Sequence, residues 1–239
     1  MRLSVHSRIL GVAIGAAAML AVPVAQTPAD NTLSSAEQAA GWRLLFDGKN
    51  VDQWRGFKMQ TLPPGWAAES GALVHTPGEG TRDLISKDQF GDFDFQFDWQ
   101  LQERGNSGVM FYVTEAGSAT YHTGPEYQLL HNAGHRDGKN PLTSAGACYA
   151  LYAPAKDATK PVGEWNRSRI IVDKGHAEHW LNSEKVVEYE IGSPDWLAKV
   201  AGSKFKEWKE FGLARRGHLA LQEHGGRVAY KNLKIRTLN

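Results

Sequence analysis

Cysteine is almost absent from this chain. The 239 residues include one cysteine, Cys148, so no intramolecular disulfide and no metal site built on several thiolates can form. Cys148 lies in the apolar run Ala-Gly-Ala-Cys-Tyr, which is typical of a small buried side chain. The sequence also lacks a P-loop, a Rossmann glycine pattern, a Gly-x-Ser-x-Gly sequence and a His-Glu-x-x-His sequence. These absences argue against nucleotide-dependent, serine-hydrolase and zinc-peptidase chemistry.

An excess of charge of either sign is also missing. Lys and Arg number 27 against 26 Asp and Glu, a net charge of +1, so no basic field for nucleic acid is expected. Apolar residues make up 41%, charged residues 22% and aromatic residues 10%, which excludes a disordered, collagenous or coiled-coil protein. The near-neutral balance favours a neutral partner such as a sugar.

Residues 1–25 have the three parts of a signal peptide. Arg2 and Arg8 supply positive charge, residues 9–24 form an apolar run, and Ala25 or Ala29 could precede the cleavage point. The run is short for a membrane span, although a retained anchor is the alternative. We therefore expect a periplasmic or secreted protein with no stable membrane insertion after cleavage. Residues 26–40 are predicted to be a flexible arm, and residues 41–239 a single domain.

The rest of the chain reads as short strands separated by Gly, Pro, Asn and Asp. The clearest strand is 92–101, where aromatic residues alternate with Asp and Gln, which predicts a buried aromatic face and a solvated acidic face. One helical insertion is expected near 194–211, since Ser193 can cap it and Gly212 can end it. The prediction is an all-β, antiparallel jelly-roll sandwich. Further strands are expected at 108–113, 126–130, 148–152, 168–173, 177–181, 186–190, 218–222 and 233–236.

Two polar segments are candidates for chemistry because burial of polar groups costs free energy unless they are used. Glu126 and Gln128 share one face of a predicted strand and could act as an acid or base and a positioning amide. Arg104 and Asn106 precede another strand and suit sugar hydroxyls. The alternatives are a solvated outer face for the first pair and a turn for the second.

Two further segments are weighed in the same way. Trp165 offers a flat ring to a sugar and Asn166 follows it, although core packing is the alternative for any Trp. Gln222 and His224 are predicted to share the side of a strand opposite the core, unless they are ordinary surface groups. By the same alternation Glu223 should face the core.

No cofactor and no catalytic metal is expected. The histidine pairs 131/135 and 176/179 do not lie on a predicted helix face. A structural calcium ion held by Asp and Asn oxygens in a loop stays open as an alternative.

Several motifs in this order resemble the 3-keto-disaccharide (3-keto-glucoside) hydrolase domain, over about residues 41–238. One departure is His131, where Asp is usual in the family. The resemblance implies a concanavalin-like jelly roll, export, and a small-molecule oligosaccharide or glycoside as partner; it gives no oligomeric state. It rests on the segments Gly-Trp-Arg-Leu-Leu-Phe-Asp-Gly (41–48), Arg-Gly-Asn-Ser-Gly (104–108), Pro-Glu-Tyr-Gln-Leu-Leu (125–130), Gly-Glu-Trp-Asn (163–166), His-Trp-Leu-Asn (179–182), Leu-Gln-Glu-His-Gly-Gly (221–226) and Lys-Asn-Leu-Lys-Ile (231–235).

The chemistry implied by this resemblance is cleavage of a 3-keto-glycoside. The ketone at C3 acidifies the C2 proton, a base removes it, the C1 substituent leaves by elimination, and water adds. The expected base is Glu126, with His224 as the second choice. Residues expected to hold or position the sugar are Arg104, Asn106, Gln128, Trp165, Asn166, His179 and Gln222.

Three other functions remain open at this point. A carbohydrate-binding module of the same fold would need no acid or base, and the fold alone cannot separate it from an enzyme. An ordinary glycoside hydrolase would need a second carboxylate roughly 5–10 Å from the first. An interaction domain would present a flat apolar sheet face.

Overall fold

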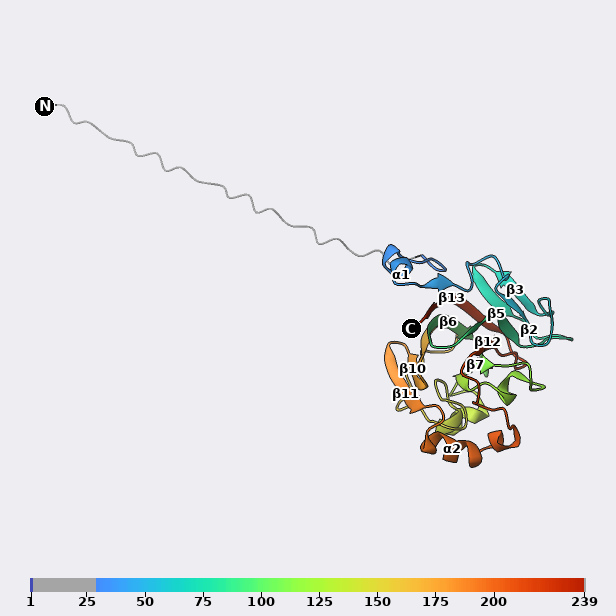
Figure 1. Cartoon of the computed structure of the whole chain (residues 1–239). Coiled ribbons are helices and arrows are strands. Elements are labelled where there is room, and N and C mark those ends of the chain that lie inside the picture. The colour runs from blue at the N-terminus through green and yellow to red at the C-terminus, as the bar shows by residue number, and fades with distance from the viewer. Residues whose placement is uncertain (2–28, 239) are drawn as a thin grey trace.

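Two antiparallel sheets stack into a sandwich in the computed structural model, which describes Met1 and residues 29–238 (Figure 1). The larger sheet has the strand order β11-β10-β9-β6-β13-β4-β3, with β1 beside β13, and the smaller has the order β2-β5-β12-β7-β8. This architecture confirms the predicted all-β sandwich. Apart from Met1, the predicted signal peptide lies outside the described residues.

The strand bounds follow sheet by sheet. The larger sheet contains β1 (Arg43–Leu44), β3 (Trp66–Glu69), β4 (Ala72–His75), β6 (Phe93–Leu101), β9 (Asn166–Asp173), β10 (His176–Leu181), β11 (Glu184–Glu190) and β13 (Val228–Thr237). The smaller sheet contains β2 (Trp54–Gly56), β5 (Leu84–Phe90), β7 (Asn106–Val113), β8 (Glu126–Leu130) and β12 (Gly217–Leu221).

The core lies between the sheets and is filled by alternate residues of the strands. Phe93, Phe95 and Phe97 of β6 are fully buried there, and Tyr127 and Leu129 of β8 enter it from the other sheet. Alternation therefore places Glu126 and Gln128 on the outer face of the smaller sheet, as the sequence predicted.

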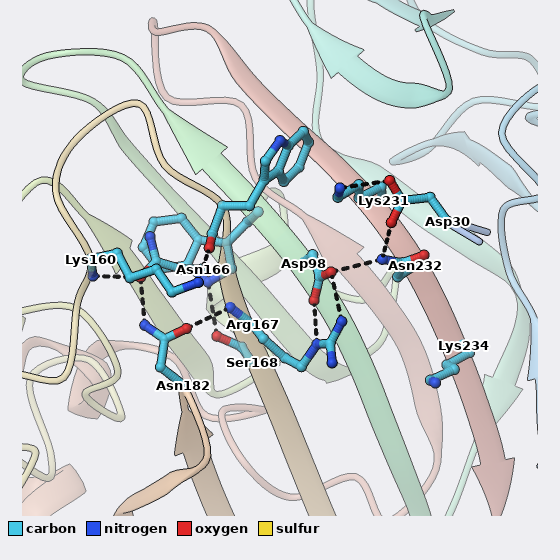
Figure 2. Close-up of polar contacts among 12 residues, drawn as sticks. Asp30, Asp98, Lys160, Asn166, Arg167, Ser168, Asn182, Lys231, Asn232 and Lys234 are labelled. Atoms are coloured by element: carbon cyan, nitrogen blue, oxygen red, sulfur yellow. Dashed lines mark hydrogen bonds and ion pairs between the residues drawn. The ribbon is translucent and has the colours of Figure 1, made fainter. Parts of the chain in front are cut away.

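The acidic face of β6 is not solvated, and the prediction was wrong on this point. Asp94 is 1% exposed and Asp98 is 6% exposed. Arg169 and Arg236, from the strands on either side of β6, form ion pairs with Asp94 at 2.6 and 3.0 Å. Arg167 pairs with Asp98 at 2.8 Å (Figure 2). Arginine stems on neighbouring strands thus cover carboxylates that alternation alone would leave in water.

The predicted helical insertion is present as α2 (Pro194–Ala201) followed by the 3-10 helix η4 (Lys204–Glu207). The Ser193 hydroxyl accepts a hydrogen bond from the Trp196 amide at 3.1 Å and caps α2. The insertion lies at one end of the molecule, and the N-terminal α1 lies at the other (Figure 1). The predicted strand 148–152 is instead a turn, in which Cys148 and Tyr152 form an isolated bridge.

The described part of the predicted flexible arm is attached to the larger sheet. It contains α1 (Ser35–Ala39), capped by Ser34 and Glu37. Asn31 is 7% exposed, and its backbone and side chain exchange hydrogen bonds of 2.6 and 2.8 Å with Asn232 of β13. These contacts correct the expectation of flexibility: Asn31 pairs with Asn232 across 201 residues of sequence, which composition does not reveal.

Within the described residues, no helix has the length and the apolar character needed to cross a bilayer.

Candidate active site

A polar cavity of about 410 Å³ opens on the outer face of the smaller sheet. Five of the predicted site residues line it: Asn106, Glu126, Gln128, Gln222 and His224. The other lining residues are Asp83, Tyr121, Tyr149, Lys204, Trp208 and Glu223. Strands β7 and β8 supply the floor, and the segments around β12, the 3-10 helix η1 (Thr120–His122) and the insertion supply the walls.

Glu126 lies at the floor of this cavity. It is 6% exposed, and burial raises the pKa of its carboxyl group to about 8. The charge of Lys204 lowers this pKa and that of Asp83 raises it. Gly108, on the neighbouring strand β7, leaves the space for the carboxylate, because a Cβ atom there would lie 2.2 Å from Glu126 Oε1. The result is a buried carboxyl group that takes up or releases a proton near neutral pH.

Two side-chain amides beside Glu126 keep free acceptor atoms. Gln128 Nε2 donates to Asn106 Oδ1 at 3.1 Å, while the Oε1 atoms of Gln128 and Gln222 are buried without a partner among the described residues. Buried polar atoms are nearly always paired in folded proteins. Free amide oxygens in a polar cavity are suited to accept hydrogen bonds from ligand hydroxyls.

Asp83 was missed by the sequence analysis. Its carboxylate accepts a hydrogen bond from the Glu223 amide at 2.8 Å and another from the Thr120 hydroxyl, and burial raises its pKa. Asp83 immediately precedes β5, so nothing in the period-two pattern marks it. It ties the loop of Glu223 and His224 to η1 and thereby holds two walls of the cavity together.

Glu223 was predicted to face the core, and that prediction was wrong. Strand β12 ends at Leu221, so alternation no longer applies to the residues after it. Glu223 therefore lines the cavity, and His224 lies at its exposed edge in the same loop. With Asp83 and Glu126, three carboxyl groups line the cavity.

The insertion supplies an aromatic wall. The Trp208 ring stacks on His122 at 4.3 Å between centroids and 16° between planes, and it lines the cavity. Lys204 Nζ lies 4.4 Å from the centroid of Tyr149 and 5.5 Å from that of Tyr121. The sequence indicated the insertion, but not that it packs beside Glu126.

Trp165 and Asn166 do not reach this cavity. Asn166 Oδ1 accepts hydrogen bonds from the Lys160 amide and from Asn182 Nδ2, both at 2.8 Å (Figure 2). Trp165 packs against small residues of the larger sheet, and Lys231 Nζ lies 4.5 Å from its ring centroid. Trp165 immediately precedes β9 of the larger sheet and Asn166 begins it, so neither is on the sheet that carries Glu126.

His179 and Arg104 are also away from the cavity. His179 is fully buried; its ring nitrogens contact the Gly146 carbonyl at 3.0 Å and the Tyr189 hydroxyl at 3.1 Å. Burial lowers the pKa of His179 to about 4, so it is a neutral core histidine. Arg104 lies in the turn before β7 with φ of 60°, and its backbone amide donates to His131 Nδ1 at 3.0 Å.

A second cavity of about 280 Å³ includes Trp99, Leu130 and Asn166 in its lining. Its side-chain amides already have partners: Asn132 Nδ2 donates to Asp157 at 3.0 Å, and Asn166 Oδ1 accepts from Asn182 Nδ2 at 2.8 Å. The first cavity, with its free amide oxygens, is therefore the better candidate site.

Among the described residues, one group of His and carboxylate side chains has the spacing of a metal site. It consists of His176, Glu178 and Glu188 on the edge strand β11 and on its neighbour β10. Lys185 Nζ lies 3.3 Å from Glu178 and 2.6 Å from Glu188, so these carboxylates already pair with a cation. The group belongs to the larger sheet and does not border the cavity.

Comparison with known proteins gives the family. Residues 41–236 match the model of the 3-keto-alpha-glucoside-1,2-lyase-like domain. The chain belongs to this family. It is 29% identical over 231 residues to the 3-keto-disaccharide hydrolase of Bacteroides thetaiotaomicron, a match that covers 84% of this chain and 80% of that protein. The resemblance seen in the sequence motifs is thereby confirmed.

Two solved structures from Parabacteroides distasonis, both described as candidate glycosyl hydrolases, share the fold of this 3-keto-alpha-glucoside-1,2-lyase-like domain. The first has a TM-score of 0.84 and 33% identity, covering 88% of this chain and 100% of that one. The second has a TM-score of 0.64 and 27% identity, covering 82% and 99%.

Proposed function

We propose that this protein cleaves 3-keto-glycosides, with Glu126 as the base. The observation that carries the proposal is the Glu126 carboxyl group, buried in a polar cavity beside two free amide oxygens, with a pKa of about 8. A base works best when its pKa lies near the working pH. The related 3-keto-disaccharide hydrolase supports the substrate class.

The reaction follows from the acidity of the C2 proton beside a C3 ketone. Glu126 takes this proton, and the electron pair of the C2–H bond becomes an enolate on C2, C3 and O3. Collapse of the enolate forms a C1–C2 double bond and breaks the bond between C1 and the leaving oxygen, which takes up a proton. Water then adds across C1 and C2, so the net reaction is hydrolysis.

The other lining residues take supporting roles in this proposal. Gln128, Gln222 and Asn106 hold sugar hydroxyls through their amides. Trp208 replaces Trp165 as the ring that stacks on the sugar, because it lies in the wall of the cavity. His224 lies at the exposed edge, where it suits proton transfer to the leaving oxygen better than removal of the C2 proton.

One observation favours a second candidate, an ordinary glycoside hydrolase. Asp83 and Glu223 share the cavity with Glu126, and two carboxyl groups across a sugar are what that reaction needs. Both Asp83 oxygens already accept hydrogen bonds from Thr120 and the Glu223 amide, which favours a structural role for Asp83.

The deciding experiment compares a 3-keto-glycoside with its unoxidised parent. The purified protein is incubated with 3-keto-trehalose and with trehalose, and sugar release is measured. Release from the keto sugar alone supports elimination through Glu126, and its loss in Glu126→Gln but not in Glu207→Gln, an exposed residue of η4, assigns the base. Cleavage of trehalose itself would establish the ordinary hydrolase, and binding without cleavage of either sugar would establish a binding module.

A further inference from the structure

The proposed reaction places a negative charge on O3 of the sugar when the C2 proton leaves. Such a charge, in a cavity with three carboxyl groups, is stabilised only if a donor or a cation lies beside it. If the protein has the proposed function, one residue of the cavity must meet this requirement.

Lys204 is the one lysine or arginine among the described residues that line the cavity. The remaining titratable groups there are Asp83, Glu126, Glu223, His224 and two tyrosines. Lys204 is the first residue of η4, and the Ser203 hydroxyl accepts a hydrogen bond from the next amide, that of Phe205, at 3.1 Å. The insertion thus brings a cation to a cavity whose floor is acidic.

Aromatic rings hold the Lys204 ammonium group in place. Its Nζ atom lies 4.4 Å from the Tyr149 centroid and 5.5 Å from the Tyr121 centroid, distances at which a cation is attracted to the ring face. Both tyrosines line the cavity themselves. The ammonium group is therefore positioned before any ligand binds, as an oxyanion-stabilising group must be.

The charge of Lys204 acts on Glu126, the proposed base. This charge lowers the pKa of Glu126 against the effect of burial, while Asp83 raises it. Glu223 and His224 act on Asp83 from the loop after β12. Lys204 and Glu126 also line the same cavity, so a sugar bound there can present its C2 proton to Glu126 and its O3 atom to Lys204.

We propose that Lys204 is a catalytic residue of the 3-keto-glycoside reaction, whose ammonium group donates a hydrogen bond to O3 and balances the enolate charge. This assignment also gives Tyr121 and Tyr149 a role, because their rings attract the ammonium group of an exposed and flexible side chain. In an unoxidised sugar this contact stabilises no developing charge, because the O3 hydroxyl does not become an enolate oxygen.

The test uses Lys204→Met, Lys204→Gln and Lys204→Arg. Lys206→Met is the matched control, because Lys206 is an exposed lysine of η4 that does not line the cavity. Two rates are measured with 3-keto-trehalose: sugar release, and exchange of the C2 proton in D₂O, which reports enolate formation alone. We expect Lys204→Met to lower both rates by about 100-fold or more, the effect of removing one oxyanion donor, with KM changed far less. Lys204→Arg should recover part of the loss, and Lys206→Met should match the wild type.

The charge and the hydrogen bond are separated by Lys204→Gln, which keeps a donor without the cation. This variant should lose activity nearly as far as Lys204→Met. Both neutral variants should also move the rise of kcat/KM to higher pH, since the charge that lowers the pKa of Glu126 is gone.

The inference is overturned if Lys204→Met retains kcat within about threefold of the wild type, or if KM alone rises, because a transition-state contact must appear in kcat. Both results presuppose an active wild-type protein. A wild type that cleaves no 3-keto-glycoside contradicts the proposed function instead, so the two failures are distinct. If Lys204→Met does not fold, the Gln and Arg variants decide in the same way.

Discussion

Gly108 leaves the space in which the Glu126 carboxylate lies, and this single missing side chain positions the base. A Cβ atom at Gly108 would lie 2.2 Å from Oε1 and 2.8 Å from Cδ of Glu126. We expect Gly108→Ala to displace the carboxylate and to lower kcat about 100-fold, since a displacement near 1 Å costs that much. Gly91→Ala is the matched control, with its nearest atom at 3.6 Å. Steady-state kinetics of the two variants check this, and full activity of Gly108→Ala would contradict the placement.

Asp83 acts on Glu126 through its charge, so the isosteric amide should change the pH profile. In Asp83→Asn, Oδ1 can still accept from the Glu223 amide and Nδ2 can donate to Thr120, which keeps the contacts of the carboxylate. Loss of the negative charge lowers the pKa of Glu126. The rise of kcat/KM should therefore begin at lower pH than in the wild type. Asp88 is an exposed carboxylate paired with Arg43, and Asp88→Asn should leave the pH profile unchanged. An unchanged pH profile in Asp83→Asn would contradict the effect of the Asp83 charge on Glu126.

The N-terminal segment is an element with a structural role, and a variant can separate this role from activity. Asn31 donates to the Gly71 carbonyl at 2.8 Å and exchanges two hydrogen bonds with Asn232; its φ of 57° also suits Asn better than Ala. We expect Asn31→Ala to lower the free energy of unfolding by about 1–3 kcal/mol, with kcat unchanged because the segment packs on the larger sheet. Denaturant unfolding with Gln38→Ala, an exposed site, as control measures this. A loss of kcat without a loss of stability would refute it.

At the level of the strands, alternation predicted faces well but could not predict which sheet a face belongs to. Glu126 and Gln128 share a face in the sequence and a cavity in the structure. His179 and Trp165 also had suitable neighbours, yet they belong to the larger sheet, where one is core and the other packs on the outer face. Pairing between distant strands decides which sheet a strand joins, and the alternation of residues within one strand does not indicate that pairing.

The loops and the insertion were the least predictable elements. Asp83 and Glu223 lie just outside β5 and β12, where alternation stops. Their placement depends on hydrogen bonds that Asp83 accepts from Thr120 of η1 and from the Glu223 amide. Trp208 and Lys204 lie on an insertion whose helical character was predictable from Ser193 and Gly212. Its position beside β8 depends on tertiary packing alone.

The two sheets divide the polar groups of the molecule between two tasks. On the outer face of the larger sheet, buried carboxylates such as Asp94 are matched by arginines. In the cavity of the smaller sheet, Glu126 has no such match, and its raised pKa measures the free energy that burial of its charge costs. A buried carboxyl group without an ion-pair partner costs stability when it ionises, and this one lies in the candidate active site.

This cost predicts how the stability of the whole molecule depends on pH. The pKa of Glu126 rises from 4.5 to about 8 on folding, so the folded state holds its proton more tightly than the unfolded state. The stabilisation is complete below pH 4.5 and is lost as the pH rises to about 8, by up to about 1.4 kcal/mol for each pH unit. Glu126→Gln has no proton to lose at this position.

We therefore expect the variant to have the same free energy of unfolding as the wild type at pH 4.5, and to be more stable than the wild type by a few kcal/mol at pH 9. Denaturant unfolding at both pH values, with Glu207→Gln as control, measures the difference. Equal stabilities at pH 9 would show that the Glu126 carboxylate is hydrated in the folded protein, and the base would then lack the raised pKa on which its assignment depends.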